Sequence, residues 1–340
     1  MNIQNNFSLK KYNSYNVDTV AKYFVSIEDE TQLEELINEY DFNYDKYFIL
    51  GNGTNVLFSS DFYDGLVIKN NIKHTLKLDL TNENIIISAS TGIDYDFLLK
   101  QYFEFLINNN LKVFGGLENL SQIPTSVGAA VIQNVGAYSI EQSDFFHNCN
   151  AICLLTGMAK SFSKNECNFD YRDSFFKQNK NYFITKVQYK ISLTNKMPTT
   201  DYDDINRIDT EDITPEKIYN IIATIRKNKI PSCVDFPNCG SFFKNPIISQ
   251  TVFDKIIKQY PDTVYYRKGN KIKLSAASLI ESCGLKGFRV GDVGISDKHS
   301  LFIVNYGNAA GYDIVSFSKI IVNKIFDMYG VILIPEVVMV

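Results

Sequence analysis

Apolar residues recur at two different spacings along the N-terminal part of the chain, and these spacings predict helices and strands in alternation. Leu33, Leu36 and Ile37 follow the i, i+3, i+4 pattern of an amphipathic helix, which we place over residues 31–40. A second predicted helix, rich in Phe and Leu, covers residues 95–108. Short apolar runs predict buried strands at residues 47–50, 66–68 and 85–89. This pattern is typical of α/β and α+β domains.

The segment from residue 115 to residue 138 interrupts the alternation. It contains four glycines, one proline and few charged residues, which predicts a long loop whose backbone can approach another group closely. A loop of this length inside a compact domain is uncommon unless it has a function. Two strand-like runs follow it, at residues 151–155 and 182–189.

A polar, proline-containing stretch near residues 195–213 predicts a boundary within the chain. Thr214 and Pro215 then open an isoleucine-rich helix as its N-cap and first helical residue, and the helix ends before Pro231. The last third repeats the alternation, with predicted helices at residues 275–283 and 313–329 and predicted strands at residues 301–304 and 331–334.

Composition narrows the class of protein. The 340 residues favour two or three domains, and 45% hydrophobic with 21% charged residues is ordinary for a globular chain. The 34 basic and 38 acidic residues give a net charge of −4, without the basic excess of a nucleic-acid-binding protein. No apolar run or N-terminal signal indicates a membrane, and the six cysteines and three histidines lack zinc-binding spacing. We therefore expect a cytoplasmic protein with reduced thiols, no metal, and no membrane or nucleic-acid partner.

The first candidate site is the motif Gly51-Asn-Gly-Thr-Asn-Val-Leu57, which follows a predicted strand. It contains Gly-x-Gly, but Val56 occupies the place of the third glycine in a dinucleotide-binding fingerprint. Two glycines with Thr54 and Asn55 offer N–H and side-chain donors that suit an anion. The alternative is a tight turn that needs a positive φ angle.

The glycine-rich middle segment is the second candidate. Gly116–Gly128 and Ile132–Tyr138 gather backbone donors and side-chain amides in a nearly uncharged stretch. Such a surface suits a polar, uncharged ring system such as a flavin, or a pyrophosphate, and the alternative is a structural loop.

Three single residues are candidates for chemistry. Arg172, between Tyr171 and Asp173, suits a bidentate contact with a substrate carboxylate, with Asp173 orienting it, or else forms a surface ion pair. Ser241, in Asn238–Pro246, lies outside a nucleophile-elbow motif, which favours a proton donor or ligand-binding hydroxyl over a nucleophile and leaves a capping role open. Glu336 lies at the end of a predicted strand, either solvated or delivered into a cleft.

Together these motifs resemble the UDP-N-acetylenolpyruvoylglucosamine reductase (UDP-N-acetylmuramate dehydrogenase) family, in the family's order along nearly the whole chain. The segment around Tyr202 resembles the longer type I form of the family. The matching motifs are Gly51–Leu57, Ile123-Pro124, Gln133–Tyr138, Tyr171–Ser174, Gly240–Pro246, Leu285–Gly287 and Pro335–Val337.

The resemblance implies an α+β fold with a two-subdomain FAD-binding module of the vanillyl-alcohol-oxidase (PCMH-like) type and a C-terminal α+β substrate-binding domain. We place the first FAD-binding subdomain at residues 1–70, the second, with the type I insertion, at 71–212, and the substrate domain at 213–340. FAD would be bound non-covalently and NADPH would be the reductant. The reaction would reduce UDP-N-acetylglucosamine enolpyruvate to UDP-N-acetylmuramate in cytoplasmic peptidoglycan synthesis. The layout is compatible with a monomer.

The resemblance also implies roles for individual residues. Arg172 would bind the substrate carboxylate, Glu336 would contact the same group while sharing a proton, and Ser241 would give a proton to C2. The expected substrate contacts are Tyr171, Tyr202, Lys229 and Asn245. The expected FAD contacts are Gly51, Asn52, Gly53, Thr54, Asn55, Glu118, Asn119, Ile123, Pro124, Ser126, Gly128, Gln133, Asn134, Gly136, Ala137 and Tyr138.

Two departures and two rival functions stay open at this point. Thr125 and Ala129 stand where the family often has glycine or another small residue, which leaves the path of the flavin loop undetermined. A flavin oxidase of the same superfamily would consume oxygen with another substrate. A catalytically silent nucleotide-binding protein would bind UDP without a flavin chromophore.

Overall fold

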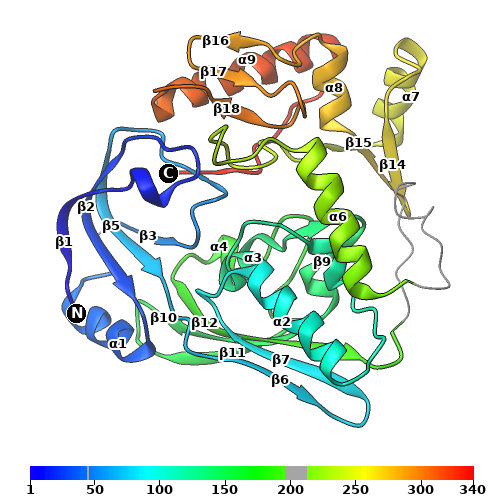
Figure 1. Ribbon diagram of the computed structural model, residues 1–340. Coiled ribbons are helices and arrows are strands. Elements are labelled where there is room, and N and C mark those ends of the chain that lie inside the picture. Colours follow the sequence, from blue (N-terminus) through cyan, green and yellow to red (C-terminus); the bar gives the residue numbers. More distant parts are fainter. Residues whose placement is uncertain (44–45, 196–212) are drawn as a thin grey trace. The chain divides into compact units, whose positions relative to one another are not determined.

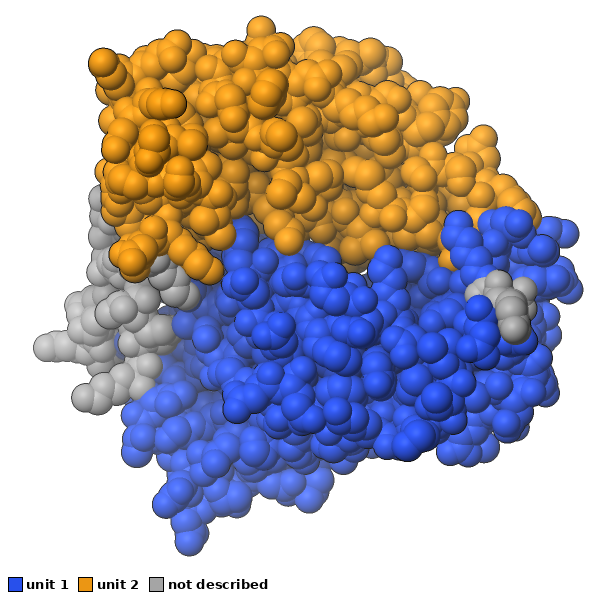
Figure 2. Space-filling view, turned by 180° about the vertical axis from the view of Figure 1, so that it is seen from behind, with its two compact units in different colours: residues 1–7, 21–52, 64–226 blue, residues 8–20, 53–63, 227–340 orange. Residues whose placement is uncertain are grey.

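The computed structural model describes residues 1–43, 46–195 and 213–340. The chain divides into two compact units, shown in different colours in Figure 2, and each unit is assembled from separate chain segments. Unit 1 comprises residues 1–7, 21–52 and 64–226, and unit 2 comprises residues 8–20, 53–63 and 227–340. The domain boundaries expected near residues 70 and 212 stay predictions.

Unit 1 contains a four-stranded sheet, a five-stranded sheet and a two-stranded hairpin (Figure 1). The first has the strand order β1-β2-β5-β3, with β3 parallel to β5. It is formed by β1 (Gln4–Ser8), β2 (Val20–Ile27), β3 (Tyr47–Leu50) and β5 (Phe62–Asn70). Helix α1 (Glu30–Glu39) begins at Asp29, whose side chain accepts from the N–H of Gln32, and it buries Leu33 and Leu36 as its sequence pattern predicts.

The second sheet of unit 1 has the order β11-β10-β12-β7-β6 and is antiparallel throughout. Helix α2 (Tyr95–Asn108) begins at Asp94 and shares one apolar core with the sheet, including Tyr102 of the helix and Ile87 of β7. The strands are β6 (Leu76–Leu80), β7 (Asn84–Ser90), β10 (Phe146–Cys153), β11 (Ala159–Ser163) and β12 (Tyr182–Ser192). Short helices η3 (Gln142–Asp144) and α4 (Phe175–Gln178) complete this part, and α6 (Pro215–Lys229) runs on into unit 2.

The middle segment is not the continuous loop that its glycine content predicts. It contains η2 (Leu117–Leu120), α3 (Val127–Gln133) and β8 (Gly136–Ala137), which pairs with β9 (Ile140–Glu141). Ser126 caps α3 by accepting from the N–H of Ala129, and Asn134 ends it at φ 45°. Residue 128, inside this helix, is glycine because a Cβ there would lie 2.8 Å from the Thr91 Cβ.

Unit 2 contains two three-stranded sheets, in the orders β13-β15-β14 and β16-β17-β18, and a parallel pair of β4 with β19. Its strands are β4 (Val56–Leu57), β13 (Ile247–Ile248), β14 (Tyr265–Lys268), β15 (Lys271–Leu274), β16 (Arg289–Val290), β17 (Val293–Ile295), β18 (Ile303–Asn305) and β19 (Val338–Met339). Its helices include η1 (Lys10–Tyr12), α7 (Gln250–Gln259), α8 (Ala276–Ser282) and α9 (Gly311–Tyr329).

The strand expected at residues 331–334 is wrong. The segment is extended, with Val331 and Leu333 buried while Ile332 and Ile334 are 62% and 60% exposed, but it lies in no strand. A single bridge pairs Pro335 with Phe243, and the ladder follows only at β19. The alternation of buried and exposed residues thus indicates an extended segment with one buried side, not a strand of a sheet.

The other predicted helices and strands are confirmed, with shifts of a few residues at their ends. No helix in the part of the chain that the structure describes is both long and apolar enough to cross a bilayer.

Candidate active site

Arg172 lies in a tight turn of unit 1. Asp170 and Asp173 exchange two backbone hydrogen bonds of 3.1 Å, which leaves Tyr171 and Arg172 at the tip. Arg172 has a φ angle of 54°, a left-handed conformation that is uncommon for a residue with a side chain. Such strained backbone persists only where the surrounding contacts fix it.

The guanidinium of Arg172 is held by a second chain segment of the same unit. It donates to the carbonyl oxygens of Gly136 and, at 3.4 Å, Asn134. Its Nη1 also lies 3.5 Å from Oε1 of Glu141, and the Arg172 side chain is 15% exposed. A charge this deeply buried needs such partners.

The role expected for Asp173 is therefore wrong. Both oxygens of Asp173 accept from Nε2 of Gln178, at 3.1 and 3.0 Å, and the carboxylate that pairs with Arg172 is Glu141. Sequence reasoning missed Glu141 because it lies 31 residues before Arg172, in a hairpin with no recognisable spacing to it. Sequence reasoning also missed Lys177, whose Nζ donates to the Arg172 carbonyl at 3.0 Å and to Oε1 of Gln133 at 2.7 Å.

Unit 1 brings the two glycine motifs predicted to bind a flavin together. A Cβ on Gly51 would lie 2.9 Å from Oγ of Ser126 and 3.0 Å from the Cβ of Ala129, so only glycine fits there without displacement. Asn52 donates to Oδ2 of Asp94 at 3.3 Å, and Asp94 forms an isolated bridge with Ser126. Residues far apart in sequence are thus brought together, with the exposed Asp94 carboxylate among them.

The remaining residues expected around the flavin lie on either side of α3. Asn119 donates to the Tyr138 carbonyl at 3.0 Å, which ties η2 to the end of the β8 strand. Ala137 pairs with Ile140 across the β8–β9 hairpin. A Cβ on Gly136 would lie 2.6 Å from the Ile140 carbonyl oxygen. Ile123 is partly buried and Pro124 is exposed, where the chain enters α3.

Glu118 is the unusual member of this group. Its side chain is fully buried, and neither carboxyl oxygen has a hydrogen-bond partner within residues 1–43, 46–195 and 213–340. Burial raises the pKa of Glu118 to about 7, although the nearby backbone N–H groups of Gly115 and Gly116 lower it in part. The single acid of the glycine-rich segment therefore lies in the core of unit 1.

The second half of the 51–57 motif belongs to unit 2. Gly53 has a φ angle of 69°, and a Cβ there would lie 1.9 Å from the Tyr12 carbonyl oxygen. Asn55 donates to the carbonyl oxygen of Glu336 at 3.4 Å, and its own carbonyl accepts from Val338 at 3.0 Å. Thr54, between them, is partly buried. This motif therefore holds the segment that carries Glu336.

Unit 2 also places Ser241 next to that segment. The N–H of Glu336 donates to the Phe242 carbonyl at 2.7 Å, and Phe242 in turn donates to the Leu301 carbonyl at 2.8 Å. The Phe242 and Phe243 rings are buried, whereas Ser241 and Glu336 are partly exposed. The buried rings and the backbone pairing thus fix the backbone at Ser241 and Glu336 on neighbouring segments.

The expected substrate contacts are distributed over both units. Asn245 accepts from the N–H of Ala276 at 2.9 Å through Oδ1. Tyr171 places its ring 5.1 Å from Cζ of Arg172, within cation–π distance. Lys229 ends helix α6. Tyr202 lies outside the described residues.

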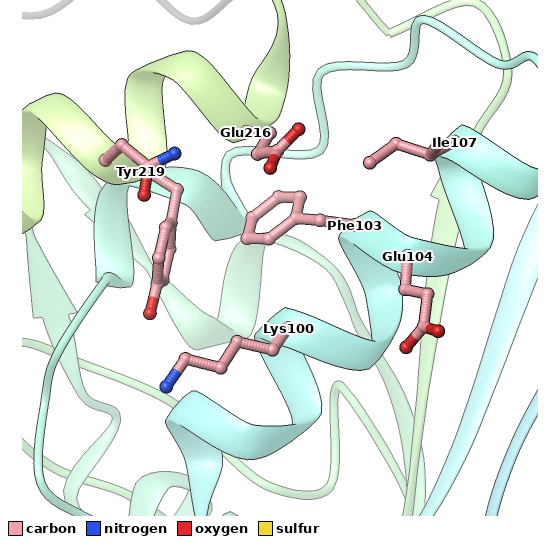
Figure 3. A pocket seen from close by; sticks show the side chains of 7 residues that line it. Lys100, Phe103, Glu104, Ile107, Glu216 and Tyr219 are labelled. Carbon is pink, nitrogen blue, oxygen red and sulfur yellow. The ribbon is translucent and has the colours of Figure 1, made fainter.

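A pocket of about 310 Å³ lies between α2 and α6, away from these residues (Figure 3). Phe103 and Ile107 provide its apolar wall from α2, and Tyr219 faces them from α6. Nearby, the Tyr219 hydroxyl donates to Asp96 at 2.9 Å. No predicted site residue lines the pocket; its lining residues are Lys100, Phe103, Glu104, Ile107, Glu216, Tyr219 and Asn220.

Comparison with known proteins identifies the family. A model of an FAD binding domain matches residues 21–160, and a model of the C-terminal domain of UDP-N-acetylenolpyruvoylglucosamine reductase matches residues 232–340. The reductase of Flavobacterium johnsoniae is 37% identical over 99% of both chains, and that of Pseudomonas putida is 34% identical over 96% of both. The chain belongs to the UDP-N-acetylenolpyruvoylglucosamine reductase family.

Membership of this family decides between the functions that the motifs left open. The chain is an FAD-dependent oxidoreductase of the UDP-N-acetylenolpyruvoylglucosamine reductase type. The crystal structure of the reductase from Thermus caldophilus shares the fold, with a TM-score of 0.66 at 23% identity over 99% of this chain and 98% of that one. The resemblance seen in the motifs and the expected fold class are thereby confirmed.

Proposed function

We propose that this chain reduces UDP-N-acetylglucosamine enolpyruvate to UDP-N-acetylmuramate, with NADPH as reductant, Arg172 as the carboxylate-binding group and Ser241 as the proton donor. The family supplies the coarser activity, a reduction in peptidoglycan synthesis. The observation that carries the finer assignment is the hydrogen bond of 2.7 Å between Glu336 and Phe242, which fixes Ser241 beside Glu336.

The residues of unit 1 fit an FAD group. A Cβ on Gly51 or Gly128 would lie within 3.0 Å of Ser126, Ala129 or Thr91, so glycine is needed at both positions for these segments to pack together. The backbone N–H groups and side-chain amides gathered there suit FAD, and Glu118, the charged residue of the segment, is withdrawn into the core. We infer that the predicted contacts from Gly51 to Asn55 and from Glu118 to Tyr138 hold FAD non-covalently. When bound, FAD supplies hydride transfer between NADPH and the enolpyruvyl group.

Arg172 stabilises the negative charge that develops on the substrate. Hydride addition at C3 of the enolpyruvyl group places charge at C2 and on the adjoining carboxylate. A guanidinium already held by Glu141 and the Gly136 carbonyl reorganises little as that charge grows, and such preorganised groups contribute most to electrostatic catalysis.

Ser241 delivers the proton that completes the reduction. Its hydroxyl is a weak acid, but C2 becomes strongly basic once hydride has been added at C3, so a positioned hydroxyl suffices. Glu336 contacts the same carboxylate as Arg172 and shares a proton with it, because two bare carboxylates would repel each other.

Tyr202, Lys229 and Asn245 bind the UDP portion, and Lys229 supplies positive charge to the diphosphate. Tyr171 lies near the flavin and the substrate. The enzyme works as a monomer in the cytoplasm.

An absorbance titration tests the proposal. The purified protein should show a flavin spectrum that anaerobic NADPH bleaches and UDP-N-acetylglucosamine enolpyruvate restores. Flavin that is bleached but recovers only with oxygen would contradict the assigned substrate. A protein that stays colourless after addition of FAD would contradict the whole proposal.

A further inference from the structure

Glu141 contacts both Arg172 and Asn134, a residue that no sequence motif predicts as a partner of Arg172. Oε1 of Glu141 lies 3.5 Å from Nη1 of Arg172, and Oε2 accepts from Nδ2 of Asn134 at 3.1 Å. The Asn134 carbonyl also accepts from Arg172, at 3.4 Å. Each of these three residues therefore contacts the other two, with the Asn134 contact to Arg172 made by the Asn134 backbone carbonyl.

Asn134 ties this set to three parts of unit 1. It ends helix α3 at φ 45°, and its Nδ2 donates to the Asp170 carbonyl at 3.0 Å, at the base of the turn that carries Arg172. Its Oδ1 accepts from the N–H of Ser143 at 3.3 Å, in the segment that follows Glu141. Asn134 is 1% exposed, so solvent competes little with its hydrogen bonds. The Glu141 side chain is 29% exposed.

We propose that Glu141 is a positioning residue, which together with Asn134 fixes the direction of the Arg172 guanidinium toward the substrate carboxylate. This inference rests on the proposed function, because it requires Arg172 to bind that carboxylate. An arginine side chain has many rotamers, and a planar guanidinium recognises a carboxylate only in a limited range of orientations. A partner that holds the guanidinium before substrate arrives removes the need to order it during the reaction.

A purely structural role for Glu141 is the competing explanation. Glu141 also takes part in capping η3, where its backbone N–H donates to Oδ2 of Asp144 at 2.8 Å. If its side chain served only the hairpin, its loss would lower stability and weaken flavin binding. If it positions Arg172, its loss also slows the step that uses the substrate carboxylate, by more than any change in stability or flavin binding explains.

The test separates the two half-reactions in Glu141→Gln and Glu141→Asp. We expect NADPH to bleach the flavin at the parent rate in both variants, although loss of the ion pair with Arg172 lowers the melting temperature of Glu141→Gln. Reoxidation by saturating enolpyruvyl substrate should slow by about 10- to 100-fold in Glu141→Gln, and Glu141→Asp should recover part of that loss. Glu166→Gln is the matched control, since Glu166 forms an exposed ion pair with Lys160 at 3.1 Å in the same unit.

Two outcomes overturn the inference: parent-like reoxidation in Glu141→Gln, or equal damage to stability and to both half-reactions in Glu141→Gln and Glu141→Asp. Arg172→Lys, measured in parallel, distinguishes failure of this inference from failure of the proposed function. Slow reoxidation in Arg172→Lys with normal Glu141→Gln rejects only the role of Glu141. Normal reoxidation in Arg172→Lys rejects the role of Arg172 itself.

Discussion

The backbone N–H of Glu336 donates a hydrogen bond of 2.7 Å to the carbonyl oxygen of Phe242, the residue that follows Ser241. Ser241 and Glu336 are far apart in sequence, yet this bond and the bridge between Phe243 and Pro335 fix them on neighbouring chain segments of unit 2. Their partial exposure leaves both side chains accessible to a substrate.

Ser241→Ala should separate the two half-reactions. Removal of the hydroxyl leaves the buried Phe242 and Phe243 rings undisturbed, so NADPH should bleach the flavin at the parent rate. Reoxidation by the enolpyruvyl substrate should slow by about 10²- to 10⁴-fold, the usual contribution of a positioned acid. Stopped-flow absorbance measures both rates. Ser249→Ala, which removes the N-cap of α7, is the control and should leave both rates normal.

Gly53→Ala should destabilise the protein more than Gly284→Ala. Both glycines have nearly the same φ angle, 69° and 70°, so both substitutions incur left-handed strain of about 1–2 kcal/mol. A Cβ at residue 53 would also lie 1.9 Å from the Tyr12 carbonyl oxygen, whereas nothing lies within 4 Å at residue 284. Thermal unfolding of the two variants compares them directly, and equal losses would contradict the crowding seen at Gly53.

The buried Glu118 should make the protein less stable as pH rises, whereas a salt-bridged acid makes a protein more stable as pH rises. Burial raises the pKa of Glu118 from 4.5 to about 7, so between these values the folded chain holds a proton that the unfolded chain releases. Stability therefore falls as pH rises from about 4.5 through 7, and the loss is complete above 7. The shift corresponds to about 3 kcal/mol.

Glu118→Gln removes this titration and tests it. Between pH 5 and pH 8, the free energy of unfolding of the variant relative to the parent should shift by about 2–3 kcal/mol in favour of the variant. Denaturant titrations at the two pH values give this difference, and any constant effect of the glutamine cancels. A difference that stays constant with pH would show that the Glu118 carboxyl is better solvated than its position indicates.

Tyr219→Phe should lower stability without affecting the flavin. The Tyr219 hydroxyl donates to Asp96 and accepts from Nε2 of Gln122, both at 2.9 Å, which ties α6 to α2. Loss of a hydrogen bond to a charged group costs about 1.5–3 kcal/mol. Calorimetric unfolding measures the loss, with Tyr312→Phe at a site 56% exposed as the control. An altered flavin spectrum would contradict the separation of this pocket from the active site.

Local sequence signals predicted the helices and most strands because their causes are local. Asp94 begins α2 and Gly330 ends α9 at φ 65°, as their residue types favour. The helix in the glycine-rich segment is harder to predict because α3 is short. The glycine within it, Gly128, is required by its contact with Thr91 rather than by a turn. Composition alone cannot distinguish these two reasons for a glycine.

The contacts around Arg172 show a second limit. The sequence shows the turn from Asp170 to Asp173 as a motif and predicts the orienting role for Asp173, the carboxylate next to Arg172. The structure assigns that contact to Glu141, which reaches Arg172 only because β9 and the turn meet through Asn134. Partners of this kind depend on tertiary packing, which spacing within one sequence does not encode.

The pairing of β4 with β19 has a consequence for synthesis of the chain. Oγ of Ser59 donates to the carbonyl oxygen of Val340, 281 residues later. At about 5–20 residues per second, the segment around Ser59 waits on the order of 15–60 s on the ribosome for this partner. All of unit 1 has been translated by residue 226, so its sheets can form while unit 2 is still incomplete. Nascent β4 is therefore the strand edge on which a chaperone would act longest.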